Sequence, residues 1–169
     1  MLLDRLSYPS IQRLLAVVIA VHNAEEAVTA SAYLTRVGEL MARIPALRDS
    51  GLPPSLRQLY AALVIVTLVP ALLIAWATTG RGSASKQEVV AVIAAALLWN
   101  VFLPHLSAMV VFRGYAPGGL TALAINLPFC IYFFRRSLRE KILTARQVAL
   151  AMILGLFLLV IAPLLLILN

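Results

Sequence analysis

Charged residues are scarce in this sequence. Asp, Glu, Lys and Arg make up 12% of its 169 residues, whereas soluble globular domains carry about 25%. Hydrophobic residues make up 62%, and a single chain of this size has too much surface to hide them all from water. The composition therefore excludes an ordinary soluble domain and predicts a chain that is covered by lipid.

Cysteine is almost absent as well. Cys130 is the one cysteine of the sequence, which excludes an internal disulfide and a cysteine metal pair. Because it lies in the apolar run 127–134, we expect an inert packing residue. The sequence also lacks internal repeats and the glycine-rich loops that bind nucleotides.

Acidic residues are half as numerous as basic ones, which gives a net charge of +7. The basic residues stand between apolar runs, as charges that flank membrane spans do, so the partner we expect is a lipid bilayer and no nucleic acid. Nine basic residues fall on the side of the N-terminus and five on the other side. The positive-inside rule then predicts a cytoplasmic N-terminus.

Five apolar stretches have about the 17–25 residues that cross a bilayer as a helix. They predict a single all-α, membrane-embedded domain over residues 1–169, a bundle of about five transmembrane helices. A short amphipathic helix on the membrane surface is expected at 36–47. The small-residue face of Ala91 and Ala94–Ala96 is suited to helix association, although the oligomeric state stays undetermined. The five predicted spans cover residues 11–33, 58–79, 88–112, 118–134 and 147–168.

The first predicted span contains three ionisable side chains within about one helical turn. His22 precedes Glu25 by three residues and Glu26 by four, and both spacings return to the same face of a helix. A charged side chain at the centre of a membrane helix costs at least about 2.5–3.5 kcal/mol, so such residues generally mark a functional site. Two adjacent carboxylates in a medium of low dielectric constant cannot both stay ionised without a counter-charge. The cluster therefore predicts either a bound cation or a protonated carboxyl group.

Residues of two other spans are expected at a similar depth. Counted at about 1.5 Å per residue from the membrane boundary, Glu26 lies about 10 Å deep and His22 about 16 Å. The same count gives about 10 Å for His105, 18 Å for Asn100 and 12 Å for Asn126. The two asparagines are also explained as interhelical hydrogen-bonding residues. The common layer nevertheless favours one shared site, with both asparagines around it.

Three sequence elements resemble a known family. The pattern His22-Asn23-Ala24-Glu25-Glu26, a second histidine at His105 and the segment Tyr115-Ala116-Pro117-Gly118 occur in the order found in the HXXEE family of small bacterial membrane proteins. The resemblance implies a metal-binding protein of the bacterial inner membrane, with no established activity. Tyr115 itself is expected at the membrane interface, either as an anchor or as a hydrogen-bonding residue above the polar layer.

The function that we expect first is a metal-dependent membrane enzyme. Metal ligands are predicted among His22, Glu25, Glu26 and His105, because nitrogen and oxygen donors of this kind suit zinc or iron. His22, His105 and one glutamate would form a minimal site, and the other glutamate would act as general base. Glu25 and Glu26 are therefore the candidate catalytic residues, and the expected substrate is a lipid-like small molecule.

Three other functions stay open. A metal-free isomerase or cyclase would use the same carboxyl groups as acid and base, with Trp99, Phe102 and Phe112 shielding a carbocation. An ion or proton carrier would use the buried carboxylates as binding groups, although no inverted repeat is visible. The chain could also be an accessory subunit of a larger complex.

Overall fold

The computed structural model describes residues 2–42, 55–79 and 83–167, and this part of the chain is entirely helical apart from its turns. The predicted all-α fold with five helical segments is confirmed. Two of the segments are built from an α-helix, a π-helix and a second α-helix that follow one another without a break. The elements are η1 (Leu2–Arg5), α1 (Tyr8–Ala42), α2 (Leu56–Thr78), α3 (Ala84–Asn100), η3 (Val101–Leu106), α4 (Ser107–Val111), α5 (Gly119–Thr121), η4 (Ala122–Asn126), α6 (Leu127–Arg139) and α7 (Ala145–Ile167).

Three of these segments are long and apolar enough to cross a membrane. They are Tyr8–Glu39, Leu56–Thr78 and Ala84–Val111. The first is longer at both ends than the predicted span 11–33, because the hydropathy pattern marks the apolar stretch while the helix continues into polar sequence at either end. The finding fits a membrane protein and agrees with the low charge content of the chain.

Side chains of the turn residues fix where two helices begin. The Ser55 hydroxyl accepts a hydrogen bond from the Gln58 N–H, and the Gln58 side chain accepts one from the Ser55 N–H at 2.8 Å. Thr144 and Gln147 make the same reciprocal pair before α7. These capping boxes satisfy N–H groups that the first turn of a helix leaves without a partner.

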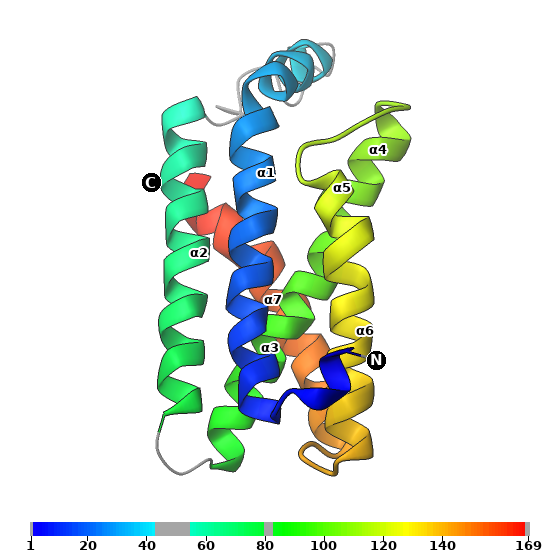
Figure 1. The fold of residues 1–169 in the computed structure, drawn as a ribbon. Coiled ribbons are helices and arrows are strands. Elements are labelled where there is room, and N and C mark those ends of the chain that lie inside the picture. Colours follow the sequence, from blue (N-terminus) through cyan, green and yellow to red (C-terminus); the bar gives the residue numbers. More distant parts are fainter. Residues whose placement is uncertain (1, 43–54, 80–82, 168–169) are drawn as a thin grey trace.

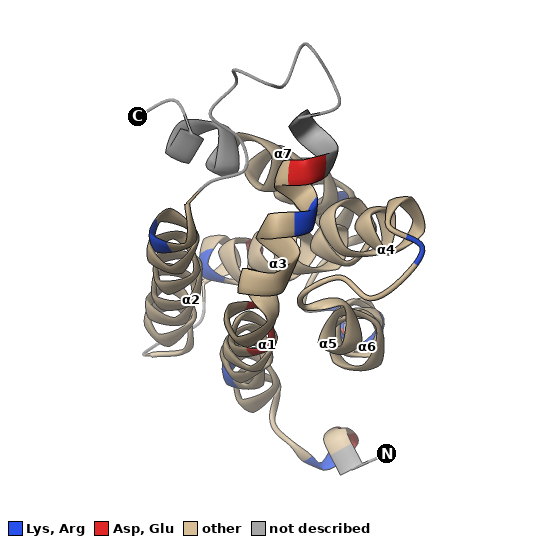
Figure 2. Cartoon of the chain, turned by 90° about the horizontal axis from the view of Figure 1, so that it is seen from above, with Lys and Arg blue, Asp and Glu red and all other residues tan. Residues whose placement is uncertain are grey.

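The helices are arranged around α3. Figures 1 and 2 show α1 between α2 and the α5–α6 segment, with α3 at the centre of the bundle and α7 on its far side. Ile11 and Leu15 of α1 pack with Val90 of α3 and Phe133 of α6 in a core where each is fully buried. By contrast, only 6% of the residues in an apolar 18-residue stretch of α2 are buried. α2 is thus strongly apolar yet covered by little protein, which fits a membrane-spanning helix whose outer face is open to lipid.

The small-residue face of α3 is covered from within the chain. A Cβ atom added to Gly155 of α7 would lie 2.6 Å from the backbone nitrogen of Ala96 and 2.7 Å from the Cβ atom of Ala95. Ala91, Ala94 and Ala95 are buried. The face thus supports helix association, as expected, but it is not exposed, since α7 packs against it in the same molecule.

The surface helix expected at 36–47 is only partly within the described residues. Its first residues belong to α1, which continues as one helix to Ala42, and residues 43–47 lie outside the described part. The last turns of α1 bend away from the helix axis and cross the top of the bundle (Figures 1 and 2).

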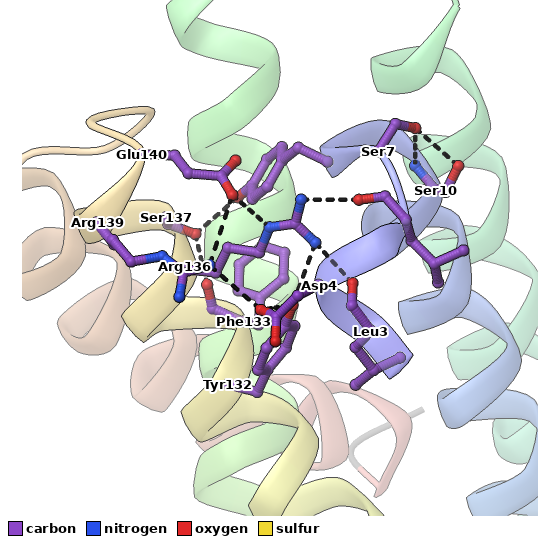
Figure 3. Close-up of polar contacts among 12 residues, drawn as sticks. Leu3, Asp4, Ser7, Ser10, Tyr132, Phe133, Arg136, Ser137, Arg139 and Glu140 are labelled. Atoms are coloured by element: carbon purple, nitrogen blue, oxygen red, sulfur yellow. Dashed lines mark hydrogen bonds and ion pairs between the residues drawn. The ribbon is translucent and has the colours of Figure 1, made fainter. Parts of the chain in front are cut away.

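A buried arginine joins η1 to α6 at the opposite end of the bundle (Figure 3). Arg136 is 6% exposed, and its guanidinium donates hydrogen bonds to the carbonyl oxygens of Leu3 at 2.9 Å and Leu6 at 2.8 Å and to Glu140 at 2.6 Å. One guanidinium thus satisfies the polar groups of a turn that precedes the first span. Because neighbouring segments run antiparallel, the basic residues of η1, of the start of α3 and of the end of α6 gather at this end.

Candidate functional site

The polar side chains of α1 face the bundle interior about halfway along the helix. His22 is 1% exposed, and its ring meets polar partners on two other segments. Its Nδ1 atom lies 2.9 Å from the hydroxyl oxygen of Thr121 in α5, and its Nε2 atom lies 2.9 Å from the amide nitrogen of Asn100 in α3. A single imidazole therefore links three helical segments.

His105 faces the same amide from the π-helix η3. Asn100 Nδ2 lies 2.9 Å from His105 Nε2 as well, and the two imidazole rings are 4.7 Å apart at an angle of 87°. The wide turn of a π-helix brings residues five apart to a similar face, which an α-helix does not do. Pro104 lies inside this segment. Because proline has no N–H group to donate to the helix, it favours such a break in the α-helical pattern.

The hydrogen-bond pattern assigns the histidine tautomers. An amide nitrogen only donates, so both Nε2 atoms accept from Asn100. His22 then carries its proton on Nδ1 and donates it to Thr121, whose hydroxyl donates in turn to the Glu25 carboxylate at 2.5 Å. The lone pairs of two ring nitrogens therefore converge on one point.

Gly118 lies directly against both rings. Its φ of +72° is in the left-handed region that favours glycine. A Cβ atom there would lie 2.7 Å from His105 Cε1 and 2.8 Å from His22 Cε1. The predicted turn at Tyr115–Gly118 is thus also a wall of the site.

Glu25 anchors the segment that follows this glycine. Its carboxylate accepts hydrogen bonds from the Leu120 N–H at 3.2 Å and the Thr121 N–H at 2.8 Å, in addition to the Thr121 hydroxyl. The Tyr115 hydroxyl donates a fourth hydrogen bond to it. Partial burial and this bond raise the pKa of Tyr115, so the phenol remains a donor at neutral pH. Tyr115 thus makes a hydrogen bond at the site, and its exposed ring is also compatible with an anchor at the membrane interface.

Glu26 has different surroundings from its neighbour. Together with His22 and His105 it offers ligand atoms that all lie within 4.8 Å of one another, and Glu25 is not in this group. Glu26 and His105 also line a cavity of about 100 Å³, whose other walls are mostly apolar and include Ala30, Leu59 and Ala108. Within the described ranges, no hydrogen bond or ion pair reaches the Glu26 carboxyl group.

Asn126 does not join this network. It lies at the end of the π-helix η4 and is fully buried, but its side-chain nitrogen and oxygen have no hydrogen-bond partner among the described residues. The structure thus brings Asn100 to both histidines and leaves Asn126 outside the hydrogen-bonded group. Cys130 is fully buried, with its sulfur 3.5 Å from the carbonyl oxygen of Ala94, as expected for a packing residue.

The aromatic residues considered for a carbocation site do not line the cavity. The Trp99 indole donates a hydrogen bond to the carbonyl oxygen of Met152 in α7 at 3.0 Å, and Phe102 is 41% exposed. Phe112 packs edge-on against Tyr33, with ring centroids 5.2 Å apart. Of these residues, Tyr33 alone is part of the cavity wall.

Thr121 is the site residue that the sequence analysis missed. A threonine near the start of a helix has an ordinary explanation as a capping residue, and nothing in its neighbourhood marks it as a partner of a histidine on another segment. Its place three residues after Gly118 was the available signal, because a helix that begins at the Tyr115–Gly118 turn carries its first side chains close to that turn.

Comparison with known proteins gives one family. The profile of the family described as "Protein of unknown function with HXXEE motif" matches residues 13–133. The uncharacterized protein YrkK of Bacillus subtilis (strain 168) is 36% identical over 67 residues, which are 39% of this chain and 42% of that protein. The chain thus aligns with less than half the length of this relative. No solved structure matches the chain. The matched region includes the His22–Glu26 motif, His105 and the Tyr115–Gly118 turn, and the chain belongs to the HXXEE family.

Proposed function

We propose that the chain is a metal-dependent membrane enzyme in which His22, His105 and Glu26 hold a divalent metal ion, zinc or iron. The observation that carries the proposal is the convergence of two Nε2 lone pairs on the Asn100 amide nitrogen, 2.9 Å from each, beside the Glu26 carboxyl group, which has no hydrogen-bond partner among the described residues. A lone carboxylate at membrane depth is costly unless a proton or a cation neutralises it. A cation bound to both imidazoles would do so.

The donor set fits such an ion after a small contraction. Ligand atoms around a tetrahedral zinc ion, each at 2.0–2.2 Å, lie roughly 3.3 Å apart. The ligand atoms of His22, Glu26 and His105 lie within 4.8 Å of one another, so the largest approach required is roughly 1.5 Å. The Glu26 side chain can supply most of this movement, since it is long and makes no hydrogen bond to the described residues that would have to break.

The remaining polar residues support the site as outer partners. A histidine that binds a metal generally donates its other ring N–H to a carboxylate, carbonyl or water, which fixes its tautomer and its orientation. Here His22 does so through Thr121 and Glu25. We therefore assign Glu26 as a ligand and Glu25 as a positioning residue, so this proposal gives neither carboxylate the role of general base that the sequence analysis expected for one of them.

The cavity indicates what kind of substrate would reach the site. A bound metal would supply Lewis-acid activation of a carbonyl or phosphoryl oxygen. The cavity of about 100 Å³ is smaller than the 300–1,000 Å³ of typical ligand pockets, so it admits a small polar group with the start of an apolar chain. A lipid-like substrate with most of its length in the bilayer meets this condition.

The alternative functions have less support. A cyclase needs room for a folded isoprenoid and aromatic walls, and Trp99 and Phe102 lie elsewhere. A carrier needs a path across the bundle, but the fully buried apolar residues Leu15, Val90 and Phe133 lie between the site and the basic end. The basic end is proposed to face the cytoplasm of a bacterial inner membrane, which places the site toward the outer leaflet.

Metal content tests the proposal directly. The full chain, purified in mild detergent, is analysed by inductively coupled plasma mass spectrometry together with His105→Ala and Glu26→Gln. Glu88→Gln is the control, because Glu88 bonds Gln147 at the other end of α3. We expect one zinc or iron per wild-type and control chain and a loss in both site variants. A folded wild-type protein that neither retains nor takes up these metals would refute the metal site.

A second measurement tests the enzyme. The metal-loaded protein and the chelated protein are each incubated with a bacterial lipid extract, which is then analysed by mass spectrometry. We expect a lipid product that requires the metal and disappears in Glu26→Gln. Identical lipid profiles with both preparations would contradict enzymatic action on these lipids.

A further inference from the structure

Asn100 lies at a position that is unusual for a side chain that only makes hydrogen bonds. Its amide nitrogen is 2.9 Å from His22 Nε2 and 2.9 Å from His105 Nε2. Both of its N–H groups therefore donate to ring nitrogens whose lone pairs are also suited to bind a metal. The amide oxygen has no hydrogen-bond partner among the described residues. The side chain is half-buried and lies at the junction of α3 and η3.

We propose that Asn100 is a fourth metal ligand, and that it becomes one when its amide turns over. This inference rests on the proposed metal site and deepens it. A planar amide carries a donor at one end and an acceptor at the other. A half-turn about the bond between Cβ and Cγ exchanges the two ends without moving the backbone, so the oxygen takes the place where the nitrogen lies beside both histidines.

Electrostatics requires such an exchange once a cation is bound. A cation at the two Nε2 atoms repels the N–H groups that point there, and it attracts the carbonyl oxygen. The exchange costs the two hydrogen bonds to the imidazoles, whose lone pairs then go to the metal. It breaks no bond of the oxygen among the described residues, because none exists.

The distances fit a ligand. Ligand atoms of one ion lie roughly 3.3 Å apart, and the Asn100 amide end lies 2.9 Å from each Nε2 atom. Its oxygen therefore has to withdraw by only roughly 0.4 Å. With Glu26 the protein ligands would be two imidazole nitrogens and two oxygens, and a substrate oxygen would join them as a fifth ligand, since zinc in catalytic sites can expand to five-coordinate.

The test compares metal affinity and coordination in full-length variants. Metal-free protein in detergent is titrated with Zn²⁺ against a competing chelator, and the Zn²⁺ complex is examined by X-ray absorption. Asn100→Ala and Asn100→Asp are compared with Asn23→Ala. Asn23 is another amide side chain, adjacent in sequence to His22; it is buried and donates to Thr67 of α2 at 2.7 Å.

We expect Asn100→Ala to weaken Zn²⁺ binding by roughly tenfold or more, since even outer-shell partners account for about 10–100-fold, and to remove one oxygen from the coordination shell. Asn100→Asp should bind Zn²⁺ at least as tightly as wild type and keep the same coordination number. Asn23→Ala should match wild type in both measurements.

Each result decides the question. Wild-type affinity and an unchanged coordination number in Asn100→Ala would overturn the inference and leave the proposed site of His22, His105 and Glu26 intact. If Asn100→Ala does not fold, Asn100→Asp provides the test. Zn²⁺ binding far weaker than in wild type, with the same number of oxygen ligands around the ion, would overturn the inference. A wild-type protein that binds no Zn²⁺ would overturn the inference and the metal site together.

Discussion

Substitution of Gly118 by alanine is the sharpest test of the site geometry. The backbone φ of +72° costs a residue with a Cβ atom roughly 1–2 kcal/mol. The new methyl group would lie 2.7 Å from His105 Cε1 and 2.8 Å from His22 Cε1, and overpacking of this kind costs about 1–3 kcal/mol. The free energy of unfolding should therefore fall by about 2–5 kcal/mol.

The same methyl group should also weaken metal binding, because it pushes on the Cε1 atoms of both rings, next to the Nε2 atoms that would hold the metal. Unfolding is followed by titration with dodecyl sulfate in mixed micelles, and metal affinity by chelator competition. Gly114→Ala is the matched control in the same turn, since its Cβ atom would meet only the Phe112 carbonyl oxygen, at 3.8 Å. If Gly118→Ala matched Gly114→Ala in stability and metal affinity, the close contact of Gly118 with both histidines would be refuted.

Three further substitutions test other contacts. Thr121→Val removes the hydroxyl between Glu25 and His22, so metal affinity measured by chelator competition should fall by roughly 10–100-fold. Thr121→Ser should stay near wild type. Wild-type affinity in the valine variant would mean that the hydroxyl does not position the histidine. Arg136→Lys keeps the charge but loses the planar fork that reaches two carbonyl oxygens. Amide hydrogen exchange in η1 should then speed up, and unchanged exchange would show that the arginine does not hold this turn. Gly155→Ala places a methyl group 2.6 Å from the backbone of α3 and should lower the free energy of unfolding by about 1–3 kcal/mol; an unchanged value would contradict the close packing of α7 on α3.

The fold followed from composition because the physical constraint is strong. A bilayer leaves helices as the main way to satisfy backbone hydrogen bonds in a chain of apolar stretches, so the number of segments was predictable. The helix ends were harder to predict. The first helix continues to Ala42 well beyond its apolar stretch, since nothing in the polar sequence after Tyr33 forces a helix to end.

The meeting of the histidines was partly predictable. Depth counting gives the level of a residue in the bilayer and says nothing about the face of the helix on which it lies. His22, His105 and Asn100 share both, but the face of His105 depends on the π-helical turn of η3, which a uniform α-helical count does not contain. Asn126 was assigned to the same layer by the same count, and its side chain makes no hydrogen bond among the described residues.

The relation between α7 and the small-residue face of α3 shows another limit of sequence reasoning. Ala94–Ala96 predict a close helix contact, and Gly155 provides the matching surface. A pattern of small residues specifies how closely a neighbour can approach. It does not specify whether that neighbour comes from the same chain or from another one.

The different surroundings of Glu25 and Glu26 explain why the motif contains two adjacent glutamates. Successive residues on an α-helix point about 100° apart, so two neighbouring carboxylates cannot serve the same partners. Glu25 meets four hydrogen-bond donors from the Tyr115 turn and the start of α5. Such charge-assisted bonds are each worth about 1.5–3 kcal/mol, enough to keep a carboxylate ionised without a metal.

Among the described residues, Glu26 meets no hydrogen-bond donor, and it lines the cavity together with His105. Its charge must be neutralised by a species that can come and go, a proton or a cation. The first glutamate therefore fixes the segment that carries Gly118 and Thr121 against the histidines, and the second leaves one side of the site open to exchange. A single carboxylate could not do both. The hydrogen-bond donors that hold it in place would already compensate its negative charge, which a bound cation needs.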